Sequence, residues 1–301
     1  MAGMTWTGVI PAITTPFTPS DSVDHAFLAR HARWMIDAGC QGVVALGSLG
    51  EGATLSFDEK VAILDTCVQA VGDRVGVAPG VAALSTGDAV RLAQAAQRVG
   101  CRGLMVLPPY VHKGPWREIK AHFEAVLAST DLPCMLYNNP VAYGTDVTAP
   151  QMAELAAAHP NLRAVKESSG DARRIAAVHA LLGGRLATLA GMDDMVVESV
   201  QVGATGWIAG LVNALPKESV RLFDLASAGT REDCLRLYYW FLPLLRLDTV
   251  PEFVQLIKLV QHEVGMGTET VRAPRLPMAG TAREQALAVI RAQLGNRPDV
   301  E

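Results

Sequence analysis

The sequence predicts an α/β fold: a (β/α)8 barrel, or TIM barrel, with a C-terminal helical extension. Short apolar runs alternate with longer segments of helical period, and eight such pairs precede residue 228. This alternation is typical of parallel strands joined by crossover helices. Each apolar run is continuous, as expected for a strand buried on both faces. Eight units over this length match the size of a (β/α)8 barrel.

The expected elements follow one another in chain order. The expected strands are 8–13, 42–46, 75–81, 103–107, 133–137, 162–166, 186–190 and 206–209. The expected helices are 24–38, 56–71, 86–99, 116–128, 148–159, 171–182, 192–201 and 216–227. Helix starts are supported by a capping box of Ser56 with Glu59, and by the candidate N-caps Asp24, Thr148 and Asp171.

A recurring helix-to-strand turn supports the same architecture. Residues 38–42, 99–103 and 202–206 each follow a helix and precede an apolar run, and the second residue is a glycine that suits a left-handed C-cap. A doubly wound open sheet is the alternative fold. Such a sheet would usually carry a Gly-rich dinucleotide-binding turn after its first strand, where this chain has Pro-Ala-Ile-Thr-Thr-Pro-Phe at 11–17.

The pattern changes after about residue 228, where the strands stop. Residues 231–247, 250–264 and 281–294 have helical patterns, with a Pro-rich link before the last. We therefore expect residues 1–228 to form the catalytic barrel and residues 229–301 a C-terminal helical domain.

Composition argues against two classes of binding partner. The chain has 301 residues, half of them apolar, with a net charge of -4 and no basic cluster, so we expect neither nucleic acid nor a membrane surface as a partner. Five dispersed cysteines without a CxxC pair argue against a disulfide framework or a zinc knuckle, and favour a reducing cytoplasm. We expect no secretory signal and no membrane span.

Lys166 is the candidate catalytic amine. It is the only one of six lysines at the end of a β-like run, and in a barrel the carboxyl ends of the strands share the face that carries the chemistry. A lysine attacks a carbonyl only as the free amine, a form that burial favours. Tyr137 ends the preceding strand and suits proton transfer at the carbon beside the resulting imine. The pair predicts Schiff-base chemistry.

The turn at 47–51, Gly-Ser-Leu-Gly-Glu, is a candidate anion site. Its backbone amides and the Ser48 hydroxyl would suit a carboxylate, because the loop is short and lacks the lysine of a phosphate-binding P-loop. We expect Glu51 to have a structural role in tying down backbone amides. No histidine lies at a strand end, and only Asp193 and Asp194 are candidate ligands on this face, so we expect no metal.

These motifs resemble the dihydrodipicolinate synthase and N-acetylneuraminate lyase family of class I Schiff-base lyases, over nearly the whole chain. The turn at 47–51 is similar to the family's Gly-Thr/Ser-Thr-Gly-Glu, residues 137–140 to its Tyr-Asn-x-Pro, and 165–168 to the segment of its Schiff-base lysine. The stretch 191–194 is similar to a further family segment.

The resemblance implies roles for particular residues. Lys166 would form the imine, Tyr137 would shuttle protons, and Ser48 with the Leu49 amide would hold the carboxylate of a 2-oxo acid. Substrate-binding residues would also include Gly47, Tyr110, Asn139 and Ile208. The resemblance further implies no cofactor beyond the lysine imine, and a homotetramer built as a dimer of dimers.

Departures from the family pattern bear on the substrate. Ala142 stands where dihydrodipicolinate synthases have an arginine, Val111 where they have a second relay tyrosine, and Leu49 where they have the second threonine. A 4-hydroxy-tetrahydrodipicolinate synthase is therefore less expected. Residues 141–144 also replace the polar sugar-binding loop of sialic acid lyases.

The combination most resembles the branch that deaminates Δ1-pyrroline-4-hydroxy-2-carboxylate to 2-oxoglutarate semialdehyde and ammonia in hydroxyproline catabolism. A 2-keto-3-deoxy sugar acid dehydratase or aldolase is the alternative, because both reactions begin at the same imine. A non-catalytic sensor of 2-oxo acids is the alternative from another class.

Overall fold

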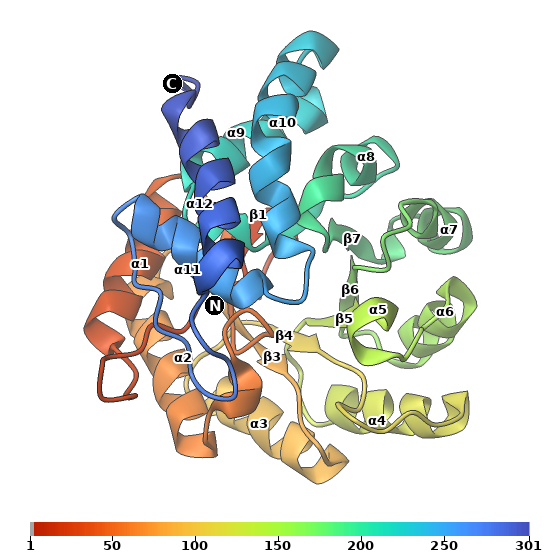
Figure 1. Cartoon of the computed structure of the whole chain (residues 1–301). Helices are drawn as coiled ribbons and strands as arrows, with labels where there is room; N and C mark the ends of the chain where they lie inside the picture. Colours follow the sequence, from red (N-terminus) through yellow and green to blue (C-terminus); the bar gives the residue numbers. More distant parts are fainter. Residues whose placement is uncertain (1–2, 301) are drawn as a thin grey trace.

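A computed structural model of the chain describes residues 3–300, and its eight parallel strands form a closed barrel (Figure 1). The strand order is β1-β8-β7-β6-β5-β4-β3-β2, and a bridge between Ala12 and Val44 joins the first strand to the second. The strands are β1 (Gly8–Pro11), β2 (Gly42–Ala45), β3 (Gly76–Val81), β4 (Leu104–Val106), β5 (Cys134–Asn138), β6 (Leu162–Glu167), β7 (Ala187–Ala190) and β8 (Gly206–Ala209). The predicted (β/α)8 barrel is confirmed, and the open sheet is wrong.

Helices surround the barrel on its outside (Figure 1). They are α1 (His25–Asp37), α2 (Phe57–Val71), α3 (Thr86–Arg98), α4 (Trp116–Ala128), α5 (Pro140–Tyr143), α6 (Ala149–Ala158), α7 (Arg173–Leu182), α8 (Val196–Gln201) and α9 (Pro216–Ala228). The capping box of Ser56 with Glu59 is confirmed, as are the N-caps Asp24 and Thr148.

Two local expectations need correction, and one short helix was not predicted. The Asp171 cap is displaced: Ala172 is the N-cap of α7, while Asp171 Oδ1 accepts a hydrogen bond from Arg173 N. The helix expected at 192–201 opens as a 3₁₀ turn, Asp193–Met195, before α8. The short helix α5 was not predicted. It begins because Pro140 fits a first helical position and Asn139 caps the turn, with its Oδ1 accepting from Ala142 N.

The recurring glycine turn has the predicted backbone. Gly39, Gly100 and Gly203 have φ angles of 104°, 95° and 111°. A residue with a Cβ is disfavoured in this left-handed region, so each glycine lets the chain leave a helix and enter the next strand directly.

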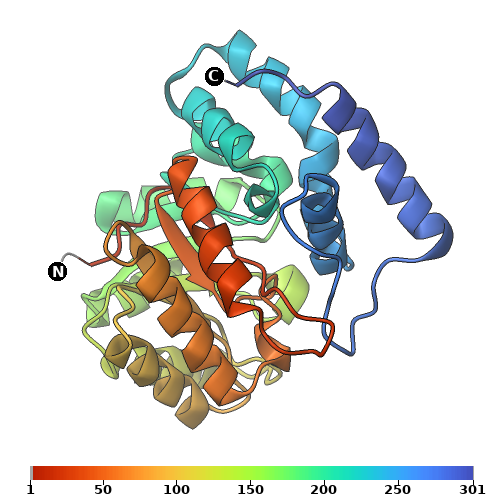
Figure 2. The same ribbon diagram turned by 90° about the vertical axis from the view of Figure 1, so that its left-hand side faces the viewer.

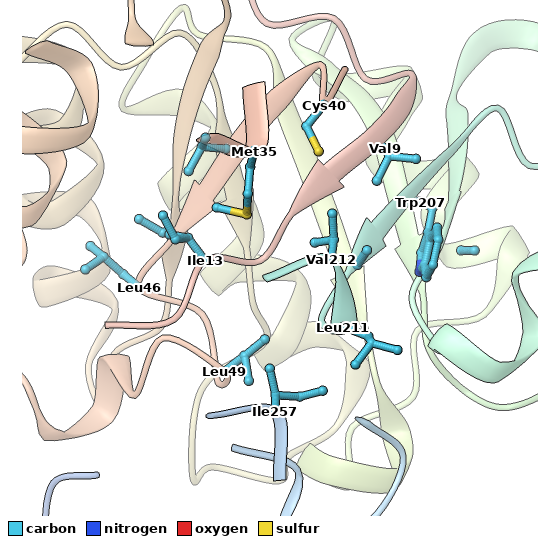
Figure 3. Packing of buried hydrophobic residues seen from close by; sticks show 14 of the residues in the cluster. Val9, Ile13, Met35, Cys40, Leu46, Leu49, Trp207, Leu211, Val212 and Ile257 are labelled. Carbon is cyan, nitrogen blue, oxygen red and sulfur yellow. The ribbon is translucent and has the colours of Figure 1, made fainter. Parts of the chain in front are cut away.

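Two buried layers result from the alternation of side chains along each strand. A cluster inside the barrel comes mainly from the strands: it includes Ile10, Val44, Met105, Met135, Ala164, Leu189 and Ile208. A larger cluster lies outside it, between strands and helices, and Figure 3 shows part of this packing around Val9, Met35 and Trp207. The inward face of β5 ends in Tyr137, which belongs to the inner cluster, and Lys166 pairs with it on β6.

The three C-terminal helices gather on one side of the barrel (Figures 1 and 2). They are α10 (Arg231–Leu245), α11 (Phe253–Glu263) and α12 (Gly280–Gly295). α11 contacts the loops at the carboxyl ends of the first strands, where Gln261 Oε1 accepts a hydrogen bond from Thr14 Oγ1 at 3.0 Å. The division into domains at residue 228 stays a prediction.

Two further findings concern the cysteines and the apolar helices. All five cysteines are free and buried. Within residues 3–300, no helix combines the length and the apolar character that crossing a membrane requires.

His31 on α1 makes the stability of the fold depend on pH. Its ring is fully buried, Nε2 lies 2.8 Å from Asn213 O, and Nδ1 has no partner among the described residues. Burial lowers the pKa of His31 to about 4. The unfolded chain, with an ordinary pKa of about 6.5, therefore binds more protons between pH 4 and 6.5, and stability is lost as the pH falls through this window.

We expect His31 to account for about 3 kcal/mol of the unfolding free energy lost between pH 7 and pH 4. Urea unfolding at both pH values would measure it, with His31→Gln as the variant because its amide can still donate to Asn213 O. The variant should lose less stability than the natural chain by about that amount. An equal loss in both proteins would contradict the assignment to His31.

Candidate active site

A cavity of about 450 Å³ opens at the carboxyl ends of the strands. The residues predicted from the sequence all line it: Lys166, Tyr137, Ser48, Gly47, Leu49, Tyr110, Asn139 and Ile208. They come from the ends of β2, β4, β5, β6 and β8, which the closed barrel brings to one rim. The structure thus gathers the predicted set, while the role of each residue stays a prediction.

Lys166 and Tyr137 form the centre of the cavity. They are register partners on β6 and β5, and the Lys166 Nζ lies 4.2 Å from the centroid of the Tyr137 ring. Only 7% of Lys166 is exposed. Gly191, after β7, leaves room for this lysine, because a Cβ there would lie 2.9 Å from Lys166 Cε. The amine is therefore held inside the barrel mouth, against an aromatic face.

The turn after β2 has a constrained backbone that leaves amides free. Leu46 and Glu51 adopt left-handed conformations with φ angles of 64° and 54°, which costs on the order of 1 kcal/mol or more per non-glycine residue. Gly50 packs so closely that a Cβ would lie 2.9 Å from Ile13 O. Within residues 3–300, the backbone N–H groups of Ser48 and Leu49 donate no hydrogen bond. Two unused donors beside the cavity suit a carboxylate.

Tyr143 is a site residue that sequence reasoning missed. Its hydroxyl shares a short hydrogen bond with Ser48 Oγ, and its ring stands edge-on to the Tyr137 ring with centroids 5.7 Å apart. Burial raises the pKa of Tyr143, and the neighbouring Tyr137 raises it further, so the phenol keeps its proton. The available signal was Asn139-Pro140, a cap followed by a first-turn proline, which indicates the helical turn that carries Tyr143 into the cavity.

Side-chain amides fix the ends of β5 and β6. Asn139 Nδ2 donates to the Tyr137 hydroxyl oxygen at 3.0 Å, which leaves the Tyr137 O–H free to donate elsewhere. Asn138 Nδ2 donates to Glu167 Oε2 at 3.0 Å, and Asn138 Oδ1 accepts from Val147 N at 2.9 Å. Burial raises the pKa of Glu167. The bond between Asn138 and Glu167 joins the two strands that carry the tyrosine and the lysine.

Glu51 ties the β2 turn to the C-terminal extension. As expected, it accepts from a backbone amide, that of Arg272 at 3.0 Å, and it also forms an ion pair with Lys258 Nζ at 2.6 Å. Lys258, on α11, is only 2% exposed, which is unusual for a lysine. Its ammonium also donates to Thr15 O and Thr270 O. Burial lowers the pKa of Lys258, and the Glu51 charge acts in the opposite direction. Because Glu51, Thr15 O and Thr270 O accept from its three N–H donors, Lys258 has a structural role.

Asp193 is a structural carboxylate. It is fully buried and accepts from Trp207 Nε1 at 2.9 Å, Leu211 N at 2.7 Å and Gly210 N at 3.1 Å. Burial raises the pKa of Asp193 to about 6, against the effect of these donors. Within the part of the chain that the structure describes, no three His, Cys, Asp or Glu side chains are arranged to hold a metal ion.

The C-terminal extension adds two ionisable residues to the cavity, Asp248 and Arg275. Asp248 ends the 3₁₀ turn Arg246–Asp248, and the Arg275 guanidinium lies 3.9 Å from Glu51 Oε2. Neither was found from the sequence, because both follow the last strand and reach the cavity only through the packing of α11.

Comparisons with known proteins agree with this architecture. The sequence matches the dihydrodipicolinate synthetase family over residues 5–293. It is 32% identical over 280 residues to a 4-hydroxy-tetrahydrodipicolinate synthase of Rhizobium meliloti (strain 1021), covering 93% of this chain and 95% of the relative. A similar enzyme of Agrobacterium fabrum is 31% identical over 280 residues, covering 93% and 95%.

Solved structures agree as well. The dihydrodipicolinate synthase from Acinetobacter baumannii complexed with pyruvate superposes with a TM-score of 0.91 at 28% identity, covering 97% of this chain and 99% of that chain. A prophage protein of the dihydrodipicolinic acid synthase family from E. coli K12, in complex with pyruvate, gives 0.90 at 27% identity, covering 96% and 98%. This chain therefore belongs to the dihydrodipicolinate synthetase family and is a class I lyase, of the kind that works through a covalent lysine Schiff base without a cofactor.

Proposed function

We propose that this enzyme deaminates Δ1-pyrroline-4-hydroxy-2-carboxylate to 2-oxoglutarate semialdehyde and ammonia, through an imine on Lys166. The segment after β5 carries the proposal. It brings a phenol, Tyr143, onto Ser48, and its position 142 holds an alanine where the synthases carry an arginine. This segment offers no cation for the second carboxylate of a larger condensation substrate. A compact substrate with one carboxylate fits better.

The first step would open the ring. Lys166 Nζ attacks C2 of the ring C=N bond, while the Ser48 and Leu49 amides with the Ser48 hydroxyl hold the carboxylate. Tyr137 gives its phenol proton to the ring nitrogen. The ring C–N bond then breaks and leaves a protonated imine between Lys166 and C2, a free amine on C5 and a phenolate on Tyr137. The buried position of Lys166 beside the Tyr137 ring supports this assignment.

The second step would be an elimination. Tyr137 takes a proton from C3, and the resulting enamine expels the C4 hydroxyl as water. Tautomerisation moves the unsaturation to the C5 nitrogen, and hydrolysis there releases ammonia. A second hydrolysis frees the product from Lys166. One water is lost and two are taken up, so the net reaction consumes one water.

A 2-keto-3-deoxy sugar acid dehydratase or aldolase is the second candidate. The observation that favours it is the pair of polar groups from the C-terminal extension, Asp248 and Arg275, which would suit the hydroxyls of an open-chain sugar acid. The imine on Lys166 would be the same in both cases. A 4-hydroxy-tetrahydrodipicolinate synthase, the activity that the relatives' names give, is disfavoured by Ala142.

A substrate panel would decide between these functions. The purified chain would be given the hydroxy-pyrroline carboxylate, a 2-keto-3-deoxy sugar acid, or pyruvate with aspartate semialdehyde, and released ammonia and consumed substrate would be measured. We expect ammonia from the first, with a kcat/KM at least about tenfold above the others, equivalent to about 1.4 kcal/mol in the transition state. Faster condensation of aspartate semialdehyde with pyruvate would show that the proposed substrate is wrong.

A homotetramer and a cytoplasmic location stay predictions. The exposed apolar side chains Leu84 and Val111, 75% and 68% exposed, are consistent with packing against another copy of the chain.

A further inference from the structure

Asp248 is a carboxyl group in the cavity that nothing in the described part of the chain satisfies. Its Oδ1 is shut off from solvent and has no hydrogen-bond partner, and its Oδ2 makes no hydrogen bond either. Buried carboxyl groups are normally paired or hydrogen-bonded, because leaving one unsatisfied costs on the order of 1–3 kcal/mol. Its neighbour Asp193, by contrast, accepts hydrogen bonds from three residues.

The fold holds this carboxyl in place through Gly210. A Cβ on Gly210 would overlap both Asp248 carboxyl oxygens, so a glycine is required after β8 for the acid to reach the cavity. The turn that ends in Asp248 also packs against the 3₁₀ turn at Asp193 and against α10 and α11. The carboxyl group is therefore built into the wall of the site.

The surrounding charges favour the protonated form. Burial raises the pKa of Asp248 well above that of an ordinary aspartate; the nearby Asp193 and Asp194 raise it further, and the Lys166 charge acts in the opposite direction. Arg275, which lines the same cavity, lies beside Glu51. A neutral carboxylic acid is an O–H donor. Here it has no acceptor in the protein, and the open space beside it is the substrate cavity.

We propose that Asp248 is the general acid that protonates the C4 oxygen of the substrate as it leaves. This inference rests on the proposed function, because that function needs an elimination at C4. Hydroxide is a poor leaving group, and a positioned acid converts it to water. Tyr137 works at C3 and the Lys166 imine at C2, so a third group must protonate the C4 oxygen.

The elimination moves electrons from the enamine nitrogen to the C4 oxygen. The enamine nitrogen reforms the C=N bond to C2, and the C2–C3 electron pair moves to form a C3=C4 double bond. The C4–O bond breaks and its electron pair goes to oxygen, which takes the Asp248 proton and departs as water. Asp248 is left as a carboxylate and regains a proton from solvent when the product leaves.

A protonated Asp248 also favours elimination over aldol cleavage of the substrate. Cleavage of the C3–C4 bond begins with removal of a proton from the C4 hydroxyl, which requires a base at that position. A protonated Asp248 adds a proton there instead. The enzyme should therefore direct a 4-hydroxy-2-oxo acid bound on Lys166 towards loss of water.

The test compares two open-chain acids that need no ring opening, 4-hydroxy-2-oxopentanoate and its 4-chloro analogue. Both would eliminate to the same conjugated 2-oxo acid, followed by its ultraviolet absorbance, but chloride leaves without a proton. Asp248→Asn should lower kcat for the hydroxy acid by about 10²-fold and leave the chloro acid within about threefold of the natural enzyme. Asp224→Asn, a change at an exposed position on α9, is the matched control and should alter neither rate.

Three results would overturn the assignment of Asp248 as the acid. An equal loss with both acids in the Asp248 variant would overturn the proposal, because a structural defect does not distinguish leaving groups. Cleavage of the hydroxy acid to pyruvate and acetaldehyde by the natural enzyme, or no reaction with it, would also overturn it. Borohydride trapping of pyruvate and the melting temperature show whether the variant is folded; if it is not, Asp248→Ala takes its place. An enzyme that eliminates from the hydroxy acid through Asp248 but releases no ammonia from the pyrroline would contradict the proposed function alone.

Discussion

Replacing Lys166 by methionine is expected to lower kcat on any 2-oxo acid or cyclic imine by about 10⁴-fold or more, because the nucleophile that forms the imine is lost. Lys166 is the only lysine among the residues that line the described cavity. Methionine has a similar length and no charge, so it should fill the barrel mouth without disturbing the packing against Tyr137. Steady-state rates on the best substrate of the panel would measure the loss.

The control for this variant is Lys217→Met, the same change at an exposed position on α9. It should keep the natural rate. A Lys166→Met enzyme that melts at the natural temperature and retains more than about a hundredth of the activity would show that catalysis does not require the imine at this residue.

Replacing Tyr143 by phenylalanine should lower kcat by about 10³-fold while KM changes little. The change removes only the hydroxyl that bonds Ser48 Oγ, so the ring contacts with Tyr137 and Tyr110 remain. The expected defect is in proton transfer, because Tyr143 is a protonated phenol that bonds the Ser48 hydroxyl and stands edge-on to Tyr137. Tyr239→Phe, at a position 65% exposed on α10, is the matched control.

A second readout separates proton transfer from a general structural effect. Pyruvate bound on Lys166 should exchange its methyl protons with deuterated water through the enamine. Tyr143→Phe should slow this exchange but leave borohydride trapping of the imine unchanged. Equal slowing of exchange and trapping would indicate a misplaced lysine, and a natural exchange rate would remove Tyr143 from the proton path.

The barrel could be predicted because its signals are local. Most strands are continuous apolar runs, and several helices begin at a cap or are followed by a glycine with a left-handed φ, as Gly39 and Gly203 have. Once the strands were placed, their carboxyl ends had to meet, so Lys166, Tyr137 and Ser48 could be assigned to one face without any knowledge of distances.

The missed residues reach the site by other routes. Tyr143 enters on a four-residue helix, too short to show a period. Asp248 and Lys258 belong to the C-terminal extension, and their positions depend on how α11 docks against loops more than 200 residues earlier, as the bonds from Lys258 to Thr15 and Glu51 show. The sequence also does not show which of its lysines are buried. The sequence separates Lys258 from Lys166 by its helical context, and the structure adds that its donors are bound to Glu51 and two carbonyl groups.

Borohydride reduction in the presence of pyruvate tests whether Lys166 forms the Schiff base. We expect a covalent adduct on Lys166, found by mass spectrometry of the digested protein, and no adduct on Lys258, whose amine is held by Glu51 and two carbonyl groups. An unmodified Lys166, or a reduced adduct on another lysine, would contradict the Schiff-base mechanism at this site.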